Sequence, residues 1–178
     1  MKALVVYDSQ FGNTEQIARA VADGLGAETA VLHAGQFTAA ALAGVGVLVV
    51  GSPTQRFHAT PPVDILLQGR DLHGLRAAAF DTRLDVTEVD SRMLRVAVKV
   101  AGDNAWAATR IANQLAKDGA TLIAPPEGFV VLDTEGPLRE GELERAKAWG
   151  KALRAASPPI IDSKEALRAN PSVISQEV

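Results

Sequence analysis

The sequence predicts a single α/β domain with a doubly wound, five-stranded parallel sheet. Three observations lead to this fold class. The chain has 178 residues, 47% of them hydrophobic, which is enough for one sizeable core. Short apolar runs alternate with helical patterns, as in βαβ units, and two of the runs are nearly continuous in valine and leucine, as buried parallel strands are.

Five apolar runs are the expected strands, at residues 3–7, 29–32, 45–50, 75–80 and 121–124. The first and third are the runs richest in valine and leucine, so we expect them near the centre of the sheet. A further strand-like run, 129–132, follows the last one after two prolines. The last strand is therefore expected to be split or extended by an excursion of the chain.

Apolar residues at helical spacing predict the helices that cover this sheet. The first pattern repeats at Ile17, Val21 and Leu25 and ends at Gly26, where a C′ glycine is typical. Further helices are expected after the two prolines at 61–62, before Gly119 and over about 143–153. From about residue 157 prolines and polar residues break the pattern, so we expect a domain over 1–156 and a loosely ordered tail over 157–178.

Charge and composition narrow the classes of function. The net charge of −3 gives no basic footprint, so we expect neither nucleic acid nor a membrane surface as a partner. The chain has no cysteine, which excludes disulfides, thiolate catalysis and cysteine-bound iron–sulfur clusters, and a cytoplasmic location is expected. The three histidines are scattered, so no metal site is predicted. Nothing in the sequence indicates the oligomeric state.

A polar loop joins the first strand to the first helix and is predicted to bind an anion. Backbone N–H groups of such a loop and of the helix N-terminus converge on one point. The chain has no lysine or arginine from 8 to 16, so neutral donors would hold the anion. The loop lacks the glycine–lysine pair of nucleotide triphosphate loops and the spaced glycines of dinucleotide sites. The candidate residues are Ser9, Gln10, Phe11, Gly12, Asn13 and Thr14, of which Asn13 or Thr14 can also cap the helix.

The segment 5–14, Val-Val-Tyr-Asp-Ser-Gln-Phe-Gly-Asn-Thr, resembles the signature of the flavodoxin family. The resemblance implies the strand order 2-1-3-4-5 and a loop that wraps the phosphate of flavin mononucleotide (FMN). Many flavodoxins have glycine at the position of Asp8 and a hydroxyl residue at that of Phe11. These two residues are therefore expected to contribute backbone groups at most.

The segment that leaves the third strand resembles the second flavin loop of flavodoxins. Its Thr-Gln-Arg-Phe stretch is also similar to a loop of flavodoxin-like NAD(P)H:quinone oxidoreductases, with one residue inserted. Phe57 is the first candidate to stack on the flavin ring and His58 the second, although Phe57 can also be a core or surface residue. The candidate contacts are Ser52, Pro53, Thr54, Gln55, Arg56, Phe57 and His58.

The third candidate loop contains Asp81, Thr82 and Arg83, directly after the fourth strand. The resemblance implies that its backbone meets the pyrimidine edge of the flavin, while Asp81 and Arg83 can instead form an ordinary salt bridge. No aromatic residue lies between Phe80 and Trp106, where flavodoxins carry one that covers the ring. A more open ring is implied unless Trp106 takes that role.

The resemblance implies an FMN-binding redox protein that carries single electrons between cytoplasmic redox partner proteins. One alternative is an enzyme in which FMN takes hydride from NAD(P)H and reduces a quinone-like acceptor. Another is a flavodoxin fold that has lost the flavin and serves as an interaction module. No residue is assigned a catalytic role.

Overall fold

A computed structural model describes residues 2–87 and 92–157. Its central sheet is parallel and has the order β2-β1-β3-β4-β5, which confirms the predicted doubly wound topology. The strands are β1 (Ala3–Tyr7), β2 (Thr29–His33), β3 (Val47–Pro53), β4 (Arg76–Leu84), β5 (Thr121–Leu122) and β6 (Glu127–Val131). The valine-rich β1 and β3 lie inside the sheet, as their composition predicted.

The edge of the sheet beside β4 is shared by two short strands, as the excursion in the sequence predicted. β5 pairs with Arg76 and Ala77, and β6 pairs with the carboxyl half of the same strand, from Phe80 to Leu84. The residues between them include Pro125 and Pro126, which have no N–H group to donate to a ladder. The chain therefore leaves the edge of the sheet after β5 and pairs with β4 again at β6.

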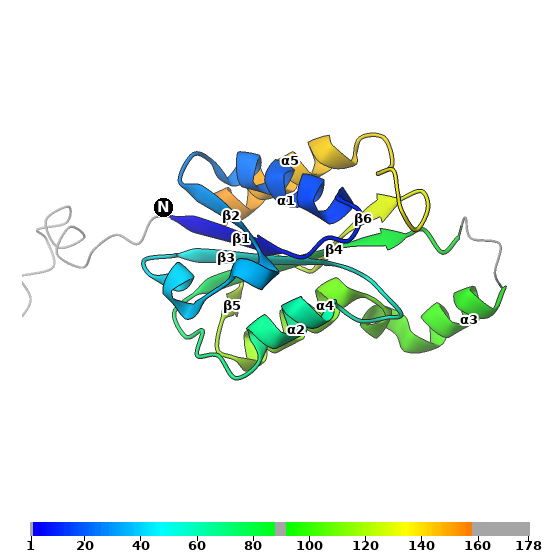
Figure 1. The fold of residues 1–178 in the computed structure, drawn as a ribbon, viewed down its shortest axis with the longest axis horizontal. Coiled ribbons are helices and arrows are strands. Elements are labelled where there is room, and N and C mark those ends of the chain that lie inside the picture. The colour runs from blue at the N-terminus through cyan, green and yellow to red at the C-terminus, as the bar shows by residue number, and fades with distance from the viewer. Residues whose placement is uncertain (1, 88–91, 158–178) are drawn as a thin grey trace, which may run out of the picture.

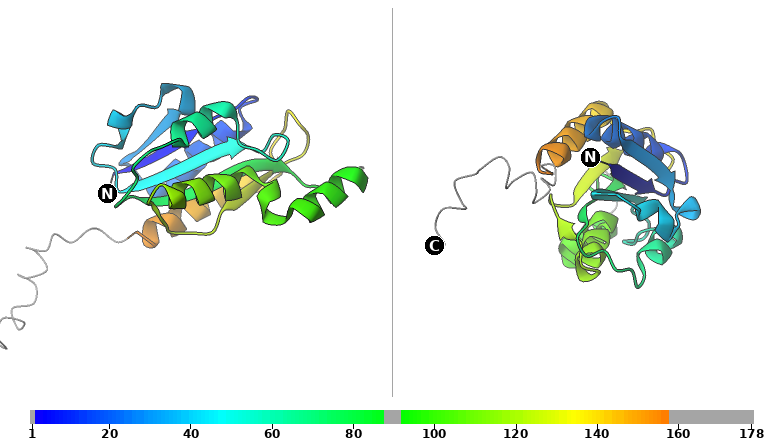
Figure 2. Two further views of the ribbon diagram at one scale, coloured as in Figure 1. Left: turned by 90° about the horizontal axis from the view of Figure 1, so that it is seen from below. Right: turned by 90° about the vertical axis from the view of Figure 1, so that its left-hand side faces the viewer.

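Helices cover both faces of the sheet (Figures 1 and 2). On one face, α1 (Asn13–Leu25) and α5 (Glu142–Ala155) pack on a core that includes Ile17, Phe80 and Leu153. On the other face, α2 (Pro61–Leu67) and α4 (Ala107–Lys117) pack on a second core. Short 3-10 turns η1 (Ala34–Gln36), η2 (Ala39–Leu42) and η3 (Gly102–Ala105) complete the connections. No helix within the described residues is long and apolar enough to cross a membrane.

One helix was not predicted. α3 (Arg92–Ala101) lies between β4 and α4 and projects beyond the end of the sheet (Figure 1). The sequence interpretation assigned helices by their fit to the faces of the sheet, and α3 packs on neither face. Its apolar positions nevertheless follow helical spacing.

Two strands are longer at their carboxyl ends than predicted. β3 includes Ser52 and Pro53, and β4 includes all of Asp81–Arg83, whereas the sequence predicts loops at both places. The extension has a physical reason, because Pro53 is paired with Thr82 across the two strands. Part of the candidate site therefore lies on rigid strands instead of loops.

The predicted tail lies outside the described residues except for Ser157. That serine is buried and its N–H donates to the carbonyl of Arg154, so it completes the end of α5. We propose that the residues after it contribute little to stability, because their sequence lacks a periodic apolar pattern. A chain ending at Ser157 should keep its melting temperature within about 3 °C of the full chain by calorimetry. A loss of about 10 °C or more would contradict this expectation.

Candidate functional site

A cleft of about 730 Å³ lies at the carboxyl ends of β1, β3 and β4. Ligands of open α/β sheets bind at this edge, and the volume is in the range of small-molecule and cofactor sites. The predicted residues that line it are Ser9, Gln10, Phe11, Asn13, Thr14, Pro53, Thr54, Gln55, Arg56, His58, Thr82 and Arg83. Among the predicted residues Gly12, Ser52, Phe57 and Asp81 are not in this lining.

The N-terminus of α1 opens toward this cleft without a side-chain cap. Its N-cap residue is Gly12, with φ 87°, so neither Asn13 nor Thr14 caps the helix as predicted. The Gly12 N–H donates to the Ser9 hydroxyl over 3.0 Å, which folds the loop tightly against the helix. The first-turn N–H groups of a helix have no intrahelical partner, so they are available to an anion.

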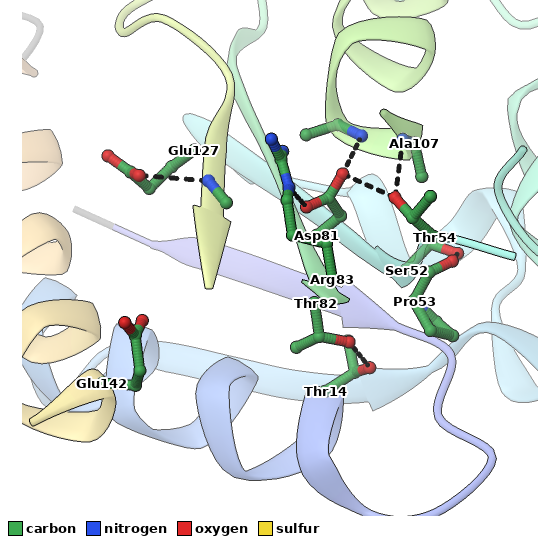
Figure 3. Close-up of polar contacts among 12 residues, drawn as sticks. Thr14, Ser52, Pro53, Thr54, Asp81, Thr82, Arg83, Ala107, Glu127 and Glu142 are labelled. Carbon is green, nitrogen blue, oxygen red and sulfur yellow. Dashed lines mark hydrogen bonds and ion pairs between the residues drawn. The ribbon is translucent and has the colours of Figure 1, made fainter. Parts of the chain in front are cut away.

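Two threonines join the start of α1 to the end of β4. The Thr14 and Thr82 hydroxyl oxygens are 2.8 Å apart and both residues are buried (Figure 3). Only one of the two hydroxyls can donate in this bond, so the other keeps a hydrogen that can be donated to a ligand. The pair fixes the loop against the sheet and adds a neutral donor to the cleft.

The second loop reverses direction in a tight turn. The backbones of Gln55 and His58 exchange two hydrogen bonds of 2.9 Å, while Arg56 and Phe57 between them have φ values of 49° and 70°. Two consecutive positive φ values are typical of a type I′ turn, which favours glycine and asparagine, so this turn is strained. The Gln55 side chain also donates to the Gln10 side chain over 2.6 Å, which ties the second loop to the first.

Phe11, which is 45% exposed, and His58, the second stacking candidate, both line the cleft. Phe57 is half-buried at the turn and lies outside the lining, so its stacking on a ring stays a prediction. Trp106 also lies outside the lining, and its ring faces the Arg83 guanidinium at 4.2 Å. That contact occupies one face of the indole ring.

Asp81 is fully buried beneath the second loop and forms a salt bridge with Arg83, which is one of the two roles that the sequence leaves open for it. Its Oδ1 accepts from Arg83 Nε at 2.5 Å, and its Oδ2 accepts from the Thr54 hydroxyl at 2.8 Å and the Ala108 N–H at 3.0 Å (Figure 3). Burial raises the pKa of this carboxyl group, and its three partners oppose the rise. The Thr54 hydroxyl in turn accepts the Ala107 N–H at 2.9 Å. Asp81 therefore joins β4, the second loop and the start of α4.

Two further polar residues near the cleft are held by contacts within the protein. The buried Ser52 hydroxyl accepts a hydrogen bond of 2.9 Å from the Thr60 N–H. This bond joins the two ends of the second loop. Asp8 lies 3.0 Å from Nε2 of His33 on β2, and Nδ1 of that histidine accepts the Gly35 N–H. The ring proton of neutral His33 is therefore on Nε2, where it can be donated to Asp8.

The structure also brings residues to the cleft that the sequence interpretation missed. These are Ala59, Pro61, Leu84, Val131 and Thr134. The strand-like run at 129–132 could have indicated Val131 and Thr134, because parallel strands end at the same edge of a sheet. The residues after β6 therefore belong to the same edge as the first and second loops.

Comparisons with known proteins agree with this arrangement. The family model described as "Flavodoxin" matches residues 5–149. The chain belongs to the flavodoxin family. No curated protein matches it as a relative.

Solved structures share the flavodoxin fold with this chain. A flavodoxin from the domain Archaea is 23% identical with a TM-score of 0.66, over 87% of this chain and 97% of that chain. Oxidised flavodoxin 2 from Bacillus cereus is 20% identical with a TM-score of 0.66, over 87% and 99% of the two chains. Rubredoxin:oxygen oxidoreductase from Desulfovibrio gigas is 20% identical with a TM-score of 0.64, over 87% of this chain and 35% of that one.

Members of the flavodoxin family bind FMN, and the residues of this chain fit that cofactor. The uncapped start of α1 suits a phosphate, and the cleft extends from it past the ends of β3 and β4. Flavodoxins also interact with redox partner proteins.

Proposed function

We propose that this chain binds one FMN in the cleft and carries single electrons between cytoplasmic redox partner proteins. The observation that carries the proposal is the uncapped N-terminus of α1, which opens into a cleft at the carboxyl edge of the sheet. Bound FMN supplies one-electron and two-electron redox chemistry. The protein supplies binding, orientation and access.

Each of the three predicted segments binds a different part of FMN. The loop Ser9–Thr14 holds the phosphate through backbone N–H groups and neutral side-chain donors. The second loop, tied to the first by the Gln55–Gln10 hydrogen bond, borders the ring. The backbone at Thr82 and Arg83 borders the remaining edge, on a strand that the Asp81 network keeps in place.

One observation favours a second candidate, an FMN-dependent NAD(P)H:quinone oxidoreductase. At the third segment the cleft is lined by Arg83 and Leu84, and the nearest tryptophan stacks on that arginine instead of the cleft. A ring that no aromatic side chain covers on this side is open to a hydride donor. The arginine also offers a cation to an anionic substrate.

Spectroscopy and potentiometry test both candidates. The purified protein should be yellow and release FMN on denaturation. A carrier should give a potential slope near 59 mV per decade for one electron, and NADPH should not reduce it in the absence of a partner enzyme. A slope near 30 mV with rapid oxidation of NADPH would identify the reductase instead. A protein that binds neither FMN nor riboflavin would contradict both and favour an interaction module.

Replacing Thr14 by valine tests the phosphate site. The variant should lose about 1 to 3 kcal/mol of FMN binding, because the charge-assisted donor is lost, and riboflavin binding should change much less. Titration calorimetry with both ligands measures the difference. Thr82→Val is the matched control, since it breaks the same Thr14–Thr82 bond from the other side. Equal weakening of FMN and riboflavin by Thr14→Val would contradict the assignment.

A further inference from the structure

α3 presents an apolar strip that the domain does not cover. Met93, Val96 and Val100 are 82%, 55% and 83% exposed. Val96 and Val100 follow Met93 by three and seven residues, so all three side chains lie on one side of the helix. Apart from η3, which follows it, α3 has few contacts with the rest of the described chain (Figure 1). An amphipathic helix normally buries its apolar face, so this strip indicates an interaction surface.

The exposed side of α3 is also cationic. Arg92, Arg95 and Lys99 are exposed and the helix contains no acidic residue. The net charge of the chain is −3, and α3 contributes +3 to it, so the remaining residues carry −6. A surface that matches α3 must therefore be apolar at its centre and acidic at its rim.

The same chain carries such a surface at the start of α5. A hollow of about 250 Å³ there is lined by Leu138 and Leu143, with the exposed carboxylates of Glu140 and Glu144 beside them. Arg139 also lines the hollow, and its guanidinium is paired with Asp85 at 3.1 Å. Leu143 is 39% exposed, which is unusual for a residue on the apolar pattern of its helix. Met93, the longest side chain of the strip, is flexible enough to fill an irregular hollow.

We infer that the occupant of the α3 strip is a second copy of this chain, which receives Met93, Val96 and Val100 at the hollow beside Glu140 and Glu144. In a two-fold dimer each α3 would dock on the partner, so the contact is made twice. Apolar side chains meet apolar side chains, and the cations of α3 meet the carboxylates of the rim. Asn13 lines both this hollow and the cleft, so the partner helix would lie beside the cleft.

Sedimentation of the full chain tests the dimer. At about 100 µM the protein should sediment as about 37 kDa, twice the 18.7 kDa of the chain. Met93→Glu with Val100→Glu should give the 18.7 kDa monomer with an unchanged circular dichroism spectrum, because both side chains are exposed. Ile65→Glu is the matched control. That residue is a 65% exposed apolar side chain on α2, and its replacement should leave the dimer intact.

A charge exchange tests whether α3 meets this particular hollow. Arg92→Glu with Lys99→Glu should weaken the dimer about tenfold or more, and so should Glu140→Lys with Glu144→Lys. The chain with all four changes should return to within about threefold of the original dissociation constant. Thermal melts of each variant show whether it is folded.

Four outcomes would overturn the inference. The first is a chain that stays monomeric at about 100 µM, and the second is a dimer that Ile65→Glu also dissociates. The third is a fourfold variant whose dissociation constant does not recover. The fourth is a monomer that co-sediments with phosphatidylglycerol vesicles through Met93 and Val100. The inference does not depend on flavin binding. A colourless dimer would refute the proposed function alone, and a yellow monomer would refute the dimer alone.

Discussion

Replacing Gly150 by valine should lower the free energy of unfolding by about 3 to 5 kcal/mol, among the largest effects expected of a single change in this chain. A Cβ atom at Gly150 would lie 2.2 Å from the carbonyl oxygen of Val21 and 3.0 Å from the Cα of Gly24. Both are backbone atoms of α1, so no side chain can turn away to make room. The crossing of α1 and α5 must open before the larger residue fits.

Urea denaturation measures this loss, with Ala148→Val as the matched control. Ala148 is exposed on the same helix, so that variant shows the cost of a β-branched residue in α5, about 0.5 kcal/mol, without the clash. The midpoint of Gly150→Val should fall well below that of the control. A difference of less than about 1 kcal/mol between the two would mean that the helices do not meet through their backbones.

The periodic pattern of α5 shows how far the sequence could predict the fold. It predicted a sheet-covering helix over about 143–153, and Ala146, Gly150 and Leu153 within it are buried. Leu143 has the same apolar spacing, yet this residue is 39% exposed beside the hollow at the start of the helix. Periodicity assigns a face but not the partner helix, so the close contact of Gly150 with α1 could not be read from it.

The candidate site was predictable where it depends on strand ends and local loop chemistry. The first loop follows β1 directly, and the positions of Ser9, Asn13 and Thr14 at the cleft are a consequence of the parallel topology. The strained turn at Arg56 and Phe57 was not predictable, because positive φ at two large residues goes against their local preference. It depends on the surrounding contacts, such as the Gln55–Gln10 hydrogen bond.

The contacts of Asp81 were not predictable because they join residues that are far apart in the sequence. Thr54 lies 27 residues before it and Ala108 lies 27 residues after it. The sequence showed only the neighbouring Arg83. Both a salt bridge with Arg83 and a position beside the flavin were therefore possible roles for Asp81. The structure favours a role for Asp81 in holding the site together.

Replacing Asp81 by alanine should therefore lower the free energy of unfolding by about 3 to 5 kcal/mol, because a partner of a buried ion pair is removed. Arg83, whose side chain is only 19% exposed, would lose its carboxylate, and the Ala108 N–H at the start of α4 would lose its acceptor. Urea denaturation again measures the change. Asp85→Ala is the control, since its bond to Arg139 is more exposed and should contribute less than about 1 kcal/mol.

The smaller change Asp81→Asn separates this supporting role from direct contact with the flavin. The amide oxygen can still accept from the Ala108 N–H and the Thr54 hydroxyl, while the charge opposite Arg83 is lost. If Asp81 acts only by holding β4 and the second loop together, the folded variant should bind FMN within about threefold of the original affinity despite its lower stability. Flavin fluorescence quenching measures that affinity at a temperature where the variant is folded. A much larger loss of FMN binding in the folded variant would show that the carboxylate acts on the flavin directly.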